Sequence, residues 1–304
     1  MATPAFIDTD RRLGRATALI GEHGGRYPSG NSLLVTGPDG SVLVDPSLSL
    51  VPRGGAPAER VDHVLVSHAH EDHMAGVHLF PDAAVHAHHQ DLLGLHSLAG
   101  FMQVYGMPRD IEDAWRPQMV EEFHYVERPD ATGFGDGDRF DLGGGVAVEV
   151  VHLAGHTRGH SGFLVDTEGV FFCADVDLTG FGPYYGDHWS DLDEFEQAIE
   201  RCRTIEARHY VTFHQKGVID GRPEFLRLLA DYAAVIGRRD DAMLAFLAEP
   251  RTIEEMVEHR FVYRPAVEIT FASHVERRTA QQHVARFVRR GQAVATDDGR
   301  FVVA

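Results

Sequence analysis

The chain has 304 residues, enough for one large α/β domain or for a catalytic domain with a small appendage. Its 28 Lys and Arg stand against 46 Asp and Glu, a formal net charge of −18 with histidine neutral, which disfavours nonspecific binding to nucleic acids. No apolar run reaches the about 18 residues that span a membrane, and the first residues lack the basic start and long apolar stretch of a signal peptide. We therefore expect a soluble, cytoplasmic protein whose two cysteines, Cys173 and Cys202, are reduced thiols in the core.

The first part of the chain is typical of stacked sheets covered by helices. The turn Gly37-Pro-Asp-Gly40 between two apolar runs predicts a hairpin over residues 32–45. Residues 191–208 are predicted to form a helix with Ser190 as its N-cap and carboxylates in its first turn. Short β-branched and aromatic runs predict strands at 61–67, 84–87, 146–153, 162–166, 170–174 and 209–213. The alternation of predicted strands and helices along the chain indicates an α/β fold.

Two later stretches depart from that alternation. Residues 91–127 are helix-like and too long for an ordinary connection, so they form either a cap over a site or plain helical packing. After Pro223, helices are predicted over 224–237, 240–248, 252–258 and 274–290, followed by a hairpin with an Asp-Gly turn. Three helices and a two-stranded wing are typical of a winged helix. We expect a catalytic domain at 1–225 and a winged-helix-like domain at 240–304.

The sharpest chemical feature directly follows the predicted strand at 61–67. It is the run Ser67-His68-Ala69-His70-Glu71-Asp72-His73. In an extended segment alternate residues face one side, so His68, His70 and Asp72 can point together, whereas His73 begins the next helical turn and points elsewhere. One short loop can therefore serve two metal ions.

Three further ligand-type residues follow predicted strands in the same way. They are His156, Asp175 and His214. Residues that follow the ends of neighbouring strands converge on one rim of a sheet, where α/β folds place their sites. Imidazole and carboxylate without thiolate suit zinc, and also manganese or iron. We therefore expect two Zn²⁺ ions per chain, with Fe or Mn as alternatives.

These motifs together resemble the five-motif pattern of the metallo-β-lactamase superfamily over about residues 15–220. The pattern consists of Asp45, His68-x-His70-x-Asp72-His73, Gly155-His156-Thr-Arg-Gly-His160, Asp175 and His214. The resemblance implies an αββα sandwich with a dinuclear site. It assigns His68, His70 and His156 to the first metal, Asp72, His73 and His214 to the second, and Asp175 as a bridge between them. Asp45 would orient the His/Asp loop.

The sequence departs from the common family pattern at Arg158, where proline is usual; this residue is either a surface substitution or an anion contact. True β-lactamases of the family commonly lack the second histidine, here His160, so its presence favours general hydrolases such as lactonases, glyoxalase II and nucleases. No basic glutathione-binding residues are evident after Asp175, which weakens the glyoxalase II interpretation. The C-terminal arrangement resembles the β-lactamase-like protein 2 branch, which includes RNA-cleaving enzymes.

Two metal ions that share a water molecule lower its pKa to near 7, so a metal-bridging hydroxide is the expected nucleophile. Asp72 would carry the proton or act only as a ligand. His160 would donate to a substrate oxygen or support the metal loop. Tyr185 lies in a Gly/Pro loop after Asp175 and would offer its hydroxyl to the site or simply pack. Lys216, the single lysine, would bind a substrate carboxylate or remain solvated.

The leading hypothesis is a dinuclear hydrolase of a small ester, thioester or lactone. A metal-dependent single-strand endoribonuclease or phosphodiesterase is the alternative, and a DNA-binding regulator with a ligand-sensing domain is a weaker one. The Arg-rich stretch at 274–290 is amphipathic, so it packs, dimerises or closes the pocket, or it binds nucleic acid. We expect a small-molecule substrate, no association with a membrane, and a homodimer.

Overall fold

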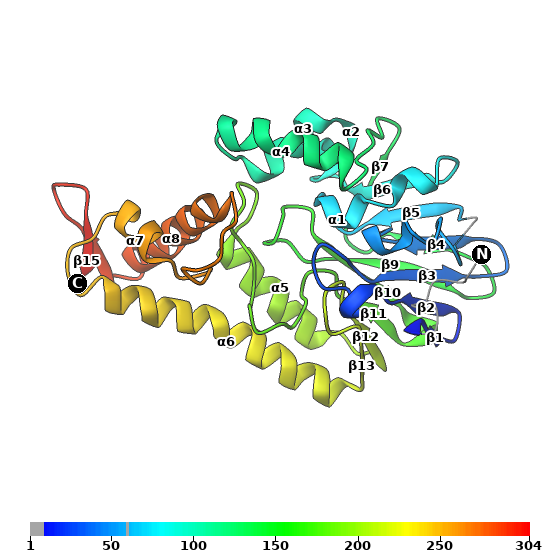
Figure 1. Ribbon diagram of the computed structural model, residues 1–304. Helices are drawn as coiled ribbons and strands as arrows, with labels where there is room; N and C mark the ends of the chain where they lie inside the picture. The colour runs from blue at the N-terminus through cyan, green and yellow to red at the C-terminus, as the bar shows by residue number, and fades with distance from the viewer. Residues whose placement is uncertain (1–8, 59–60) are drawn as a thin grey trace.

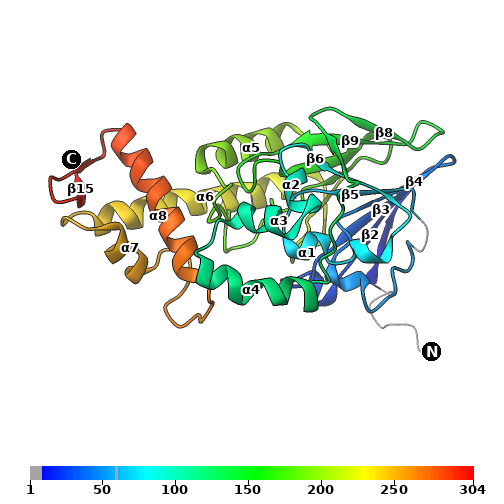
Figure 2. The ribbon, with the colours of Figure 1, turned by 90° about the horizontal axis from the view of Figure 1, so that it is seen from above.

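The computed structural model describes residues 9–58 and 61–304, so the N-terminal residues examined above for a signal peptide lie outside the described part. Two sheets face each other, with helices on both outer faces and the C-terminal elements at one end of the layers (Figures 1 and 2). No helix in the described ranges is both long and apolar enough to cross a membrane.

The first sheet has seven strands in the order β1 to β7. Their bounds are β1 Arg11–Leu13, β2 Ala16–Leu19, β3 Ser32–Thr36, β4 Ser41–Val44, β5 His63–Val66, β6 Ala84–His88 and β7 Thr132–Phe134. Neighbours from β1 to β4 are antiparallel and those from β4 to β7 are parallel. The predicted hairpin is confirmed as β3 and β4, with Leu33 opposite Val44.

The second sheet has six strands in the order β13-β12-β11-β10-β9-β8. Their bounds are β8 Arg139–Asp141, β9 Ala147–His152, β10 Ser161–Val165, β11 Val170–Phe172, β12 His209–Val211 and β13 Val218–Asp220. Only β11 and β12 run parallel to each other. All six predicted strands therefore form, at or within a few residues of the expected positions.

Three apolar layers hold the sandwich together. Between the sheets lie side chains from both, including Leu33, Val44, Val148, Phe163, Phe172 and Val211, all fully buried. The outer face of the first sheet is covered by α1 Glu71–Met74, α2 Leu92–His96, α3 Leu98–Tyr105 and α4 Arg109–Glu121. The outer face of the second is covered by α5 Leu192–Thr204 and α6 Arg222–Phe246. The predicted αββα order is confirmed, and both cysteines are free and buried.

The N-cap of α5 is Asp191, so the prediction of Ser190 is wrong. The Asp191 carboxylate accepts hydrogen bonds from the backbone N–H groups of Asp193 and Glu194, both at 2.9 Å. The hydroxyl of Ser190 instead donates to the carbonyl of His156 at 2.7 Å. A carboxylate at this position also opposes the positive end of the helix, which a hydroxyl does not.

The C-terminal part begins within α6, a single helix of 25 residues that replaces the two predicted at 224–237 and 240–248. The two merge because the residues between them contain no proline or other strong helix breaker. The remaining elements are α7 Ile253–His259, α8 Ala272–Arg289, β14 Ala293–Ala295 and β15 Phe301–Val303. The two strands pair antiparallel, as predicted for the terminal hairpin. The winged-helix assignment and the domain limits stay predictions.

This C-terminal part has an apolar cluster of its own. The cluster consists of Met243, Leu247, Met256, Ala280, Val284, Phe287 and Ala293, with Phe246 and Phe301 packed against it. Short 3-10 helices complete the described fold: η2 Glu22–Gly24, η3 Leu48–Leu50, η4 Val77–Leu79 and η5 Asp166–Glu168. Because α6 contributes to this cluster and to the layer on the second sheet, one helix connects the two parts (Figure 2).

Candidate metal centre and substrate cavity

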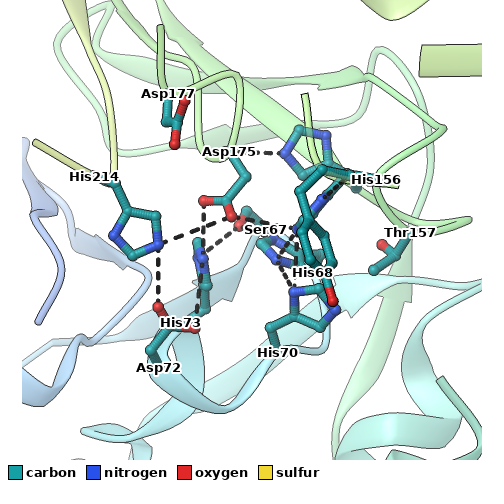
Figure 3. A network of polar contacts seen from close by, with 12 residues as sticks. Ser67, His68, His70, Asp72, His73, His156, Thr157, Asp175, Asp177 and His214 are labelled. Atoms are coloured by element: carbon teal, nitrogen blue, oxygen red, sulfur yellow. Dashed lines mark hydrogen bonds and ion pairs between the residues drawn. The ribbon is translucent and has the colours of Figure 1, made fainter. Parts of the chain in front are cut away.

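The structure brings all seven predicted ligands to one edge of the two sheets (Figure 3). His68 and His70 lie in the loop after β5, and Asp72 and His73 lie in α1. The other three follow the strands β9, β11 and β12, and they are His156, Asp175 and His214. Convergence therefore follows from the strand order, because the ends of these strands meet at the same edge.

The first group of ligand atoms is compact. The Nε2 atom of His68 lies 3.0 Å from Nδ1 of His70, and Nε2 of His156 lies 3.1 Å from both. The Oδ2 atom of Asp175 lies 3.3 Å from Nε2 of His156. Three imidazole nitrogens and one carboxylate oxygen within this small volume match the donor set of a zinc site.

The second group consists of Asp72, His73 and His214. Nε2 of His214 lies 3.2 Å from Oδ2 of Asp72, and Nε2 of His73 lies 3.9 Å from Oδ1 of Asp72. Asp175 also faces this group, because its Oδ1 atom lies 3.1 Å from Nε2 of His73. Its two oxygens are thus directed at different groups, as the bridging role implied by the family resemblance requires.

A test of whether cations fit here comes from unpaired polar atoms. Oδ2 of Asp72, Nε2 of His73 and Oδ1 of Asp175 are buried, and their close contacts within the ligand groups lack the geometry of hydrogen bonds among the described residues. Buried polar atoms are normally hydrogen-bonded, so three such atoms without a hydrogen bond in one small volume indicate that a partner, such as a metal ion, is missing. A pair of divalent cations fits this set of nitrogen and oxygen donors, whether zinc, manganese or iron.

Asp45 lies where the sequence predicts, behind the His/Asp loop. Its Oδ2 atom accepts hydrogen bonds from Nδ1 of His73 at 2.8 Å and from the hydroxyl of Ser67 at 2.6 Å. The Ser67 hydroxyl lies 3.0 Å from Nδ1 of His68, which places it to accept from that nitrogen. One buried carboxylate therefore orients ligands of both groups, directly for His73 and through Ser67 for His68.

The other three histidines are oriented by partners that the sequence did not indicate. Nδ1 of His156 lies 2.8 Å from the carbonyl of Tyr184, and Nδ1 of His214 lies 2.9 Å from the carbonyl of Gly25. Nε2 of His70 lies 3.0 Å from Oδ2 of Asp187, which is fully buried. Each of these contacts leaves the opposite ring nitrogen free for a metal.

Asp91 is another buried carboxylate that the sequence analysis missed. It accepts hydrogen bonds from the N–H of Ala69 at 3.1 Å, the hydroxyl of Thr157 at 2.6 Å and the N–H of Gly159 at 2.7 Å. These bonds join the loop of His68 and His70 to the loop of His156. Its position shortly after β6 was a signal in the sequence that could have identified it, since the ligands also follow strands.

Comparison with known proteins agrees with this geometry. The model of the metallo-beta-lactamase superfamily matches residues 26–214, more than half of the chain. The chain belongs to the metallo-beta-lactamase superfamily. Membership of this superfamily and the two His/Asp groups support a metallo-hydrolase. No curated protein sequence matches the chain.

Solved structures share the fold of this superfamily member over almost its full length. A metallo-beta-lactamase family protein from Thermus thermophilus has 20% identity and a TM-score of 0.69, covering 95% of this chain and 99% of its own. A beta-lactamase domain protein from Burkholderia ambifaria has 17% identity and a TM-score of 0.68, covering 100% of this chain and 95% of its own. These likenesses extend to the C-terminal part, but at such identities they show the fold alone.

His160, the second histidine of the superfamily motif, lies behind Asp175. Its Nδ1 donates to the carbonyl of Leu153 at 2.8 Å, and its Nε2 accepts from the N–H of Asp175 at 3.1 Å. Burial lowers the pKa of His160 to about 3, so the ring is neutral and can accept this bond. Of the two roles considered for His160, the geometry favours support of the metal loop.

Tyr185 does not offer its hydroxyl to the site, so its predicted catalytic position is wrong. The hydroxyl lies 2.9 Å from Nε2 of His283 and accepts from Nη1 of Arg239 at 3.0 Å, in the interface with α6 and α8. Its neighbour Tyr184 lines the cavity instead. Adjacent residues of an extended segment face opposite sides, which explains the error of one position.

Two other residues singled out in the sequence lie outside the cavity lining. Lys216 is exposed and does not line the cavity. Arg158 is also exposed, and its guanidinium lies 4.8 Å from the centre of the Trp189 ring. The structure therefore places neither of them in the wall of the cavity.

A cavity of about 310 Å³ lies over the ligand groups. Besides His70, Asp72, His156, Asp175 and His214, its lining consists of Tyr27, Glu71, Tyr105, Met107, Trp115, Asp177, Thr179, Phe181, Tyr184, Gln215, Tyr263, Ile269 and Phe271. The segment at 91–127 thus provides cavity walls and also packs on the first sheet. None of the described residues that line this cavity is a lysine or arginine.

Two carboxyl groups face this cavity without being in the predicted ligand set. Glu71 accepts hydrogen bonds from the hydroxyls of Tyr27, at 2.9 Å, and Tyr105. Burial and the charge of Asp175 raise the pKa of Asp177 to about 7. The lining of the cavity is therefore both acidic and aromatic.

The loop at 181–190, here named the metal-flanking loop, is held by α6 and α8. Arg278 donates from Nη2 to the carbonyl of Ser190 at 2.9 Å and from Nε to that of Asp187 at 3.2 Å. Gln282 donates to the carbonyl of Tyr185 at 2.7 Å. The metal-flanking loop contains the carboxylate that faces His70 and the carbonyl that faces His156, so the C-terminal helix supports the first ligand group.

Proposed function

We propose that this protein is a dinuclear metal-dependent hydrolase of a small ester, thioester or lactone. The observation that carries this proposal is the cavity over the two ligand groups, whose lining beyond the ligands is mostly aromatic and apolar and contains no described lysine or arginine. An uncharged acyl compound can enter such a cavity by burying apolar surface. A phosphodiester would bring a negative charge that only the two metal ions could neutralise, because the described lining offers no cationic side chain to bind it as well.

We assign His68, His70 and His156 to one cation and Asp72, His73 and His214 to the other, with Asp175 between them. Zinc is the proposed metal, since imidazole and carboxylate donors suit it. When bound, two such cations activate water and polarise a substrate oxygen. The ligands are oriented by fixed partners, so the site requires little rearrangement to bind them.

The chain's own residues position the substrate. Tyr184 lies in the cavity wall, and its hydroxyl donates to Asp187 at 3.0 Å, which fixes the direction of the ring. We propose that Tyr184 takes the substrate-contacting role expected of Tyr185. Tyr105 stacks on the ring of His70, with ring centres 4.9 Å apart, and forms part of the apolar wall that excludes water from the reacting carbonyl.

The alternatives that involve nucleic acid are less well supported. The arginines of α8 contact groups of the same chain: Arg277 pairs with Glu254, Arg286 with Asp193 and Glu196, and Arg289 with Asp193. A helix whose cations are already neutralised gains little from phosphate. We therefore place α8 in packing rather than in an endoribonuclease or a DNA-binding regulator. A cytoplasmic location and a homodimer stay predictions.

The test is turnover by the zinc-loaded protein of an aryl ester, a thioester, a lactone, a phosphodiester and single-stranded RNA. We expect hydrolysis of at least one carbonyl substrate, which is lost in Asp175→Ala and kept in Lys216→Ala, because Lys216 is exposed and lies outside the cavity lining. Bound metal and circular dichroism are measured for each variant, so that loss of the metal is separated from loss of the fold. RNA cleavage without carbonyl turnover would overturn the proposal.

A further inference from the structure

A second hollow of about 610 Å³ lies beside the metal cavity. It is lined by Gly180, Phe181, Val235, Arg238, Arg239, Ala242, Phe261, Val262, Tyr263, Arg264 and Val267, and is here named the arginine groove. Phe181 and Tyr263 line both hollows, and the centres of their rings lie 5.7 Å apart. These two rings form a wall that the hollows share, so the two hollows are adjacent, and a molecule that occupied both would extend along this wall.

The charge of the groove is opposite to that of the metal cavity. Arg238 and Arg264 are exposed, and neither forms an ion pair within the described ranges 9–58 and 61–304. Most arginines of α8, by contrast, are paired with carboxylates. In a chain with a net charge of −18, two unpaired guanidinium groups beside one hollow form a local positive site.

The walls of the groove are fixed by buried polar groups. Arg239 is buried and donates to the carbonyls of Phe181 at 2.9 Å and Pro183 at 2.6 Å. On the other side, the buried carboxylate of Glu276 accepts from the N–H groups of Phe261 at 2.8 Å and Tyr263 at 2.7 Å. Both walls are therefore held in place without a ligand, which lowers the entropic cost of binding one.

We propose that the arginine groove binds an anionic tail of the substrate whose carbonyl reacts in the metal cavity. The substrate class is then an acyl ester or thioester that carries a carboxylate or phosphate group remote from the reacting carbonyl. Guanidinium groups bind both oxyanions through paired N–H donors, whereas the described lining of the metal cavity offers no such cation. This inference rests on the proposed hydrolase function, which it deepens.

The test compares three esters that share one acyl length and one leaving group: 4-nitrophenyl hexanoate, mono-4-nitrophenyl adipate and 4-nitrophenyl 6-phosphonooxyhexanoate. With the zinc-loaded wild type, we expect one or both anionic esters to have a kcat/KM about three- to tenfold above that of the neutral ester, mainly through KM. The preferred anionic ester identifies the oxyanion. The preference should decrease as salt is raised, because the arginines are exposed.

The matched variants are Arg238→Gln with Arg264→Gln, and Arg290→Gln as a control. Arg290 is also exposed but lies at the end of α8, outside the groove lining. We expect the double variant to lose the preference for anionic esters while keeping its kcat/KM for the neutral ester, and the control to keep both. Equal kcat/KM for all three esters, or an unchanged preference in the double variant, would overturn the groove proposal and leave the hydrolase proposal intact.

Binding of adipate to the metal-free protein, measured by calorimetry, tests the groove when no ester is hydrolysed. Failure of every ester to turn over contradicts the hydrolase proposal rather than the groove. Adipate binding that weakens at least threefold in the double variant supports an anion site. Adipate binding that is absent, or equal in wild type and double variant, overturns it.

Discussion

Arg278 offers the clearest test of how the C-terminal helix supports the metal centre. In Arg278→Ala, the metal-flanking loop loses the bonds of 2.9 Å and 3.2 Å to the carbonyls of Ser190 and Asp187. A hydrogen bond from a charged donor contributes about 1.5–3 kcal/mol, and the half-exposed position and the longer bond reduce this, so we expect a loss of about 1–3 kcal/mol in the free energy of unfolding. Because Asp187 faces His70, we also expect metal affinity to fall about 10- to 100-fold.

Two measurements separate these effects. Urea unfolding of the metal-free protein reports the loss of stability, and competition with a chelator reports the affinity for each metal equivalent. The control is Arg277→Ala at the neighbouring position, since Arg277 pairs with Glu254 on the surface, at 40% and 64% side-chain exposure. A surface pair of this kind contributes about 0–1 kcal/mol, and the change should leave metal affinity unchanged.

Binding of both metal equivalents by Arg278→Ala as tightly as by the wild type would refute this reasoning. A loss of stability alone would show that Arg278 attaches the C-terminal part without orienting the ligands. Gln282→Ala provides an independent check, because Gln282 bonds to the same loop at the carbonyl of Tyr185, at 2.7 Å. It should weaken metal binding in the same direction by a smaller factor, since the two lost bonds, to the carbonyl of Tyr185 and from the N–H of Leu192, are between neutral groups.

Three further predictions concern residues around the ligands. Asp91→Asn replaces one accepting oxygen with a donor that faces donors, and should lower the free energy of unfolding in urea by about 1–3 kcal/mol; wild-type stability would contradict this. His160 has a pKa of about 3 in the folded protein and near 6.5 in the unfolded chain, so the unfolded chain binds the extra proton and the free energy of unfolding decreases as the pH falls below 6.5. The decrease contributed by His160, up to about 1.4 kcal/mol per pH unit, should be absent from His160→Gln, which should therefore lose less stability per pH unit than the wild type. An equal pH dependence in both proteins would contradict the depressed pKa. In Gly30→Ala the new Cβ would lie 2.0 Å from Cζ of Phe213, so this ring, which stacks on His73 with ring centres 3.5 Å apart, must shift. Titration with a chelator should then show weaker binding of one metal equivalent. Unchanged binding of both equivalents would show that the shift of Phe213 does not reach His73.

The layered fold and the convergence of ligands could be predicted because both follow from repeating patterns. Short β-branched and aromatic runs located the strands, and ligand-type residues directly after strands had to meet at one edge. Asp187 could not be found in this way, and Asp91 was missed although it follows β6. Each is a single carboxylate in an irregular segment, and its role depends on groups far away in sequence. For Asp91 these are the hydroxyl of Thr157 and the N–H of Gly159, more than 60 residues away, and for Asp187 it is the ring of His70 in another loop.

The sequence predictions were wrong at positions where two neighbouring residues could each take the same role. Tyr184 and Tyr185 have the same chemistry, and only the backbone path of the metal-flanking loop determines which of them faces the cavity. Ser190 and Asp191 are both good N-caps, and the hydrogen bond from Ser190 to His156 decides between them. Composition and periodicity carry no information on either choice.

The attachment of the metal-flanking loop to α8 has a consequence for the order of events during synthesis. The first ligands of the metal centre leave the ribosome with residues 68–73, yet the contacts that hold the loop behind His70 and His156 come from positions 278 and 282, about 200 residues later. A nascent chain that lacks α8 therefore contains every ligand but lacks part of the support for two of them. High-affinity loading with metal then requires α8, which delays the assembly of the metal centre until residues 278 and 282 have been synthesised and have folded onto the loop.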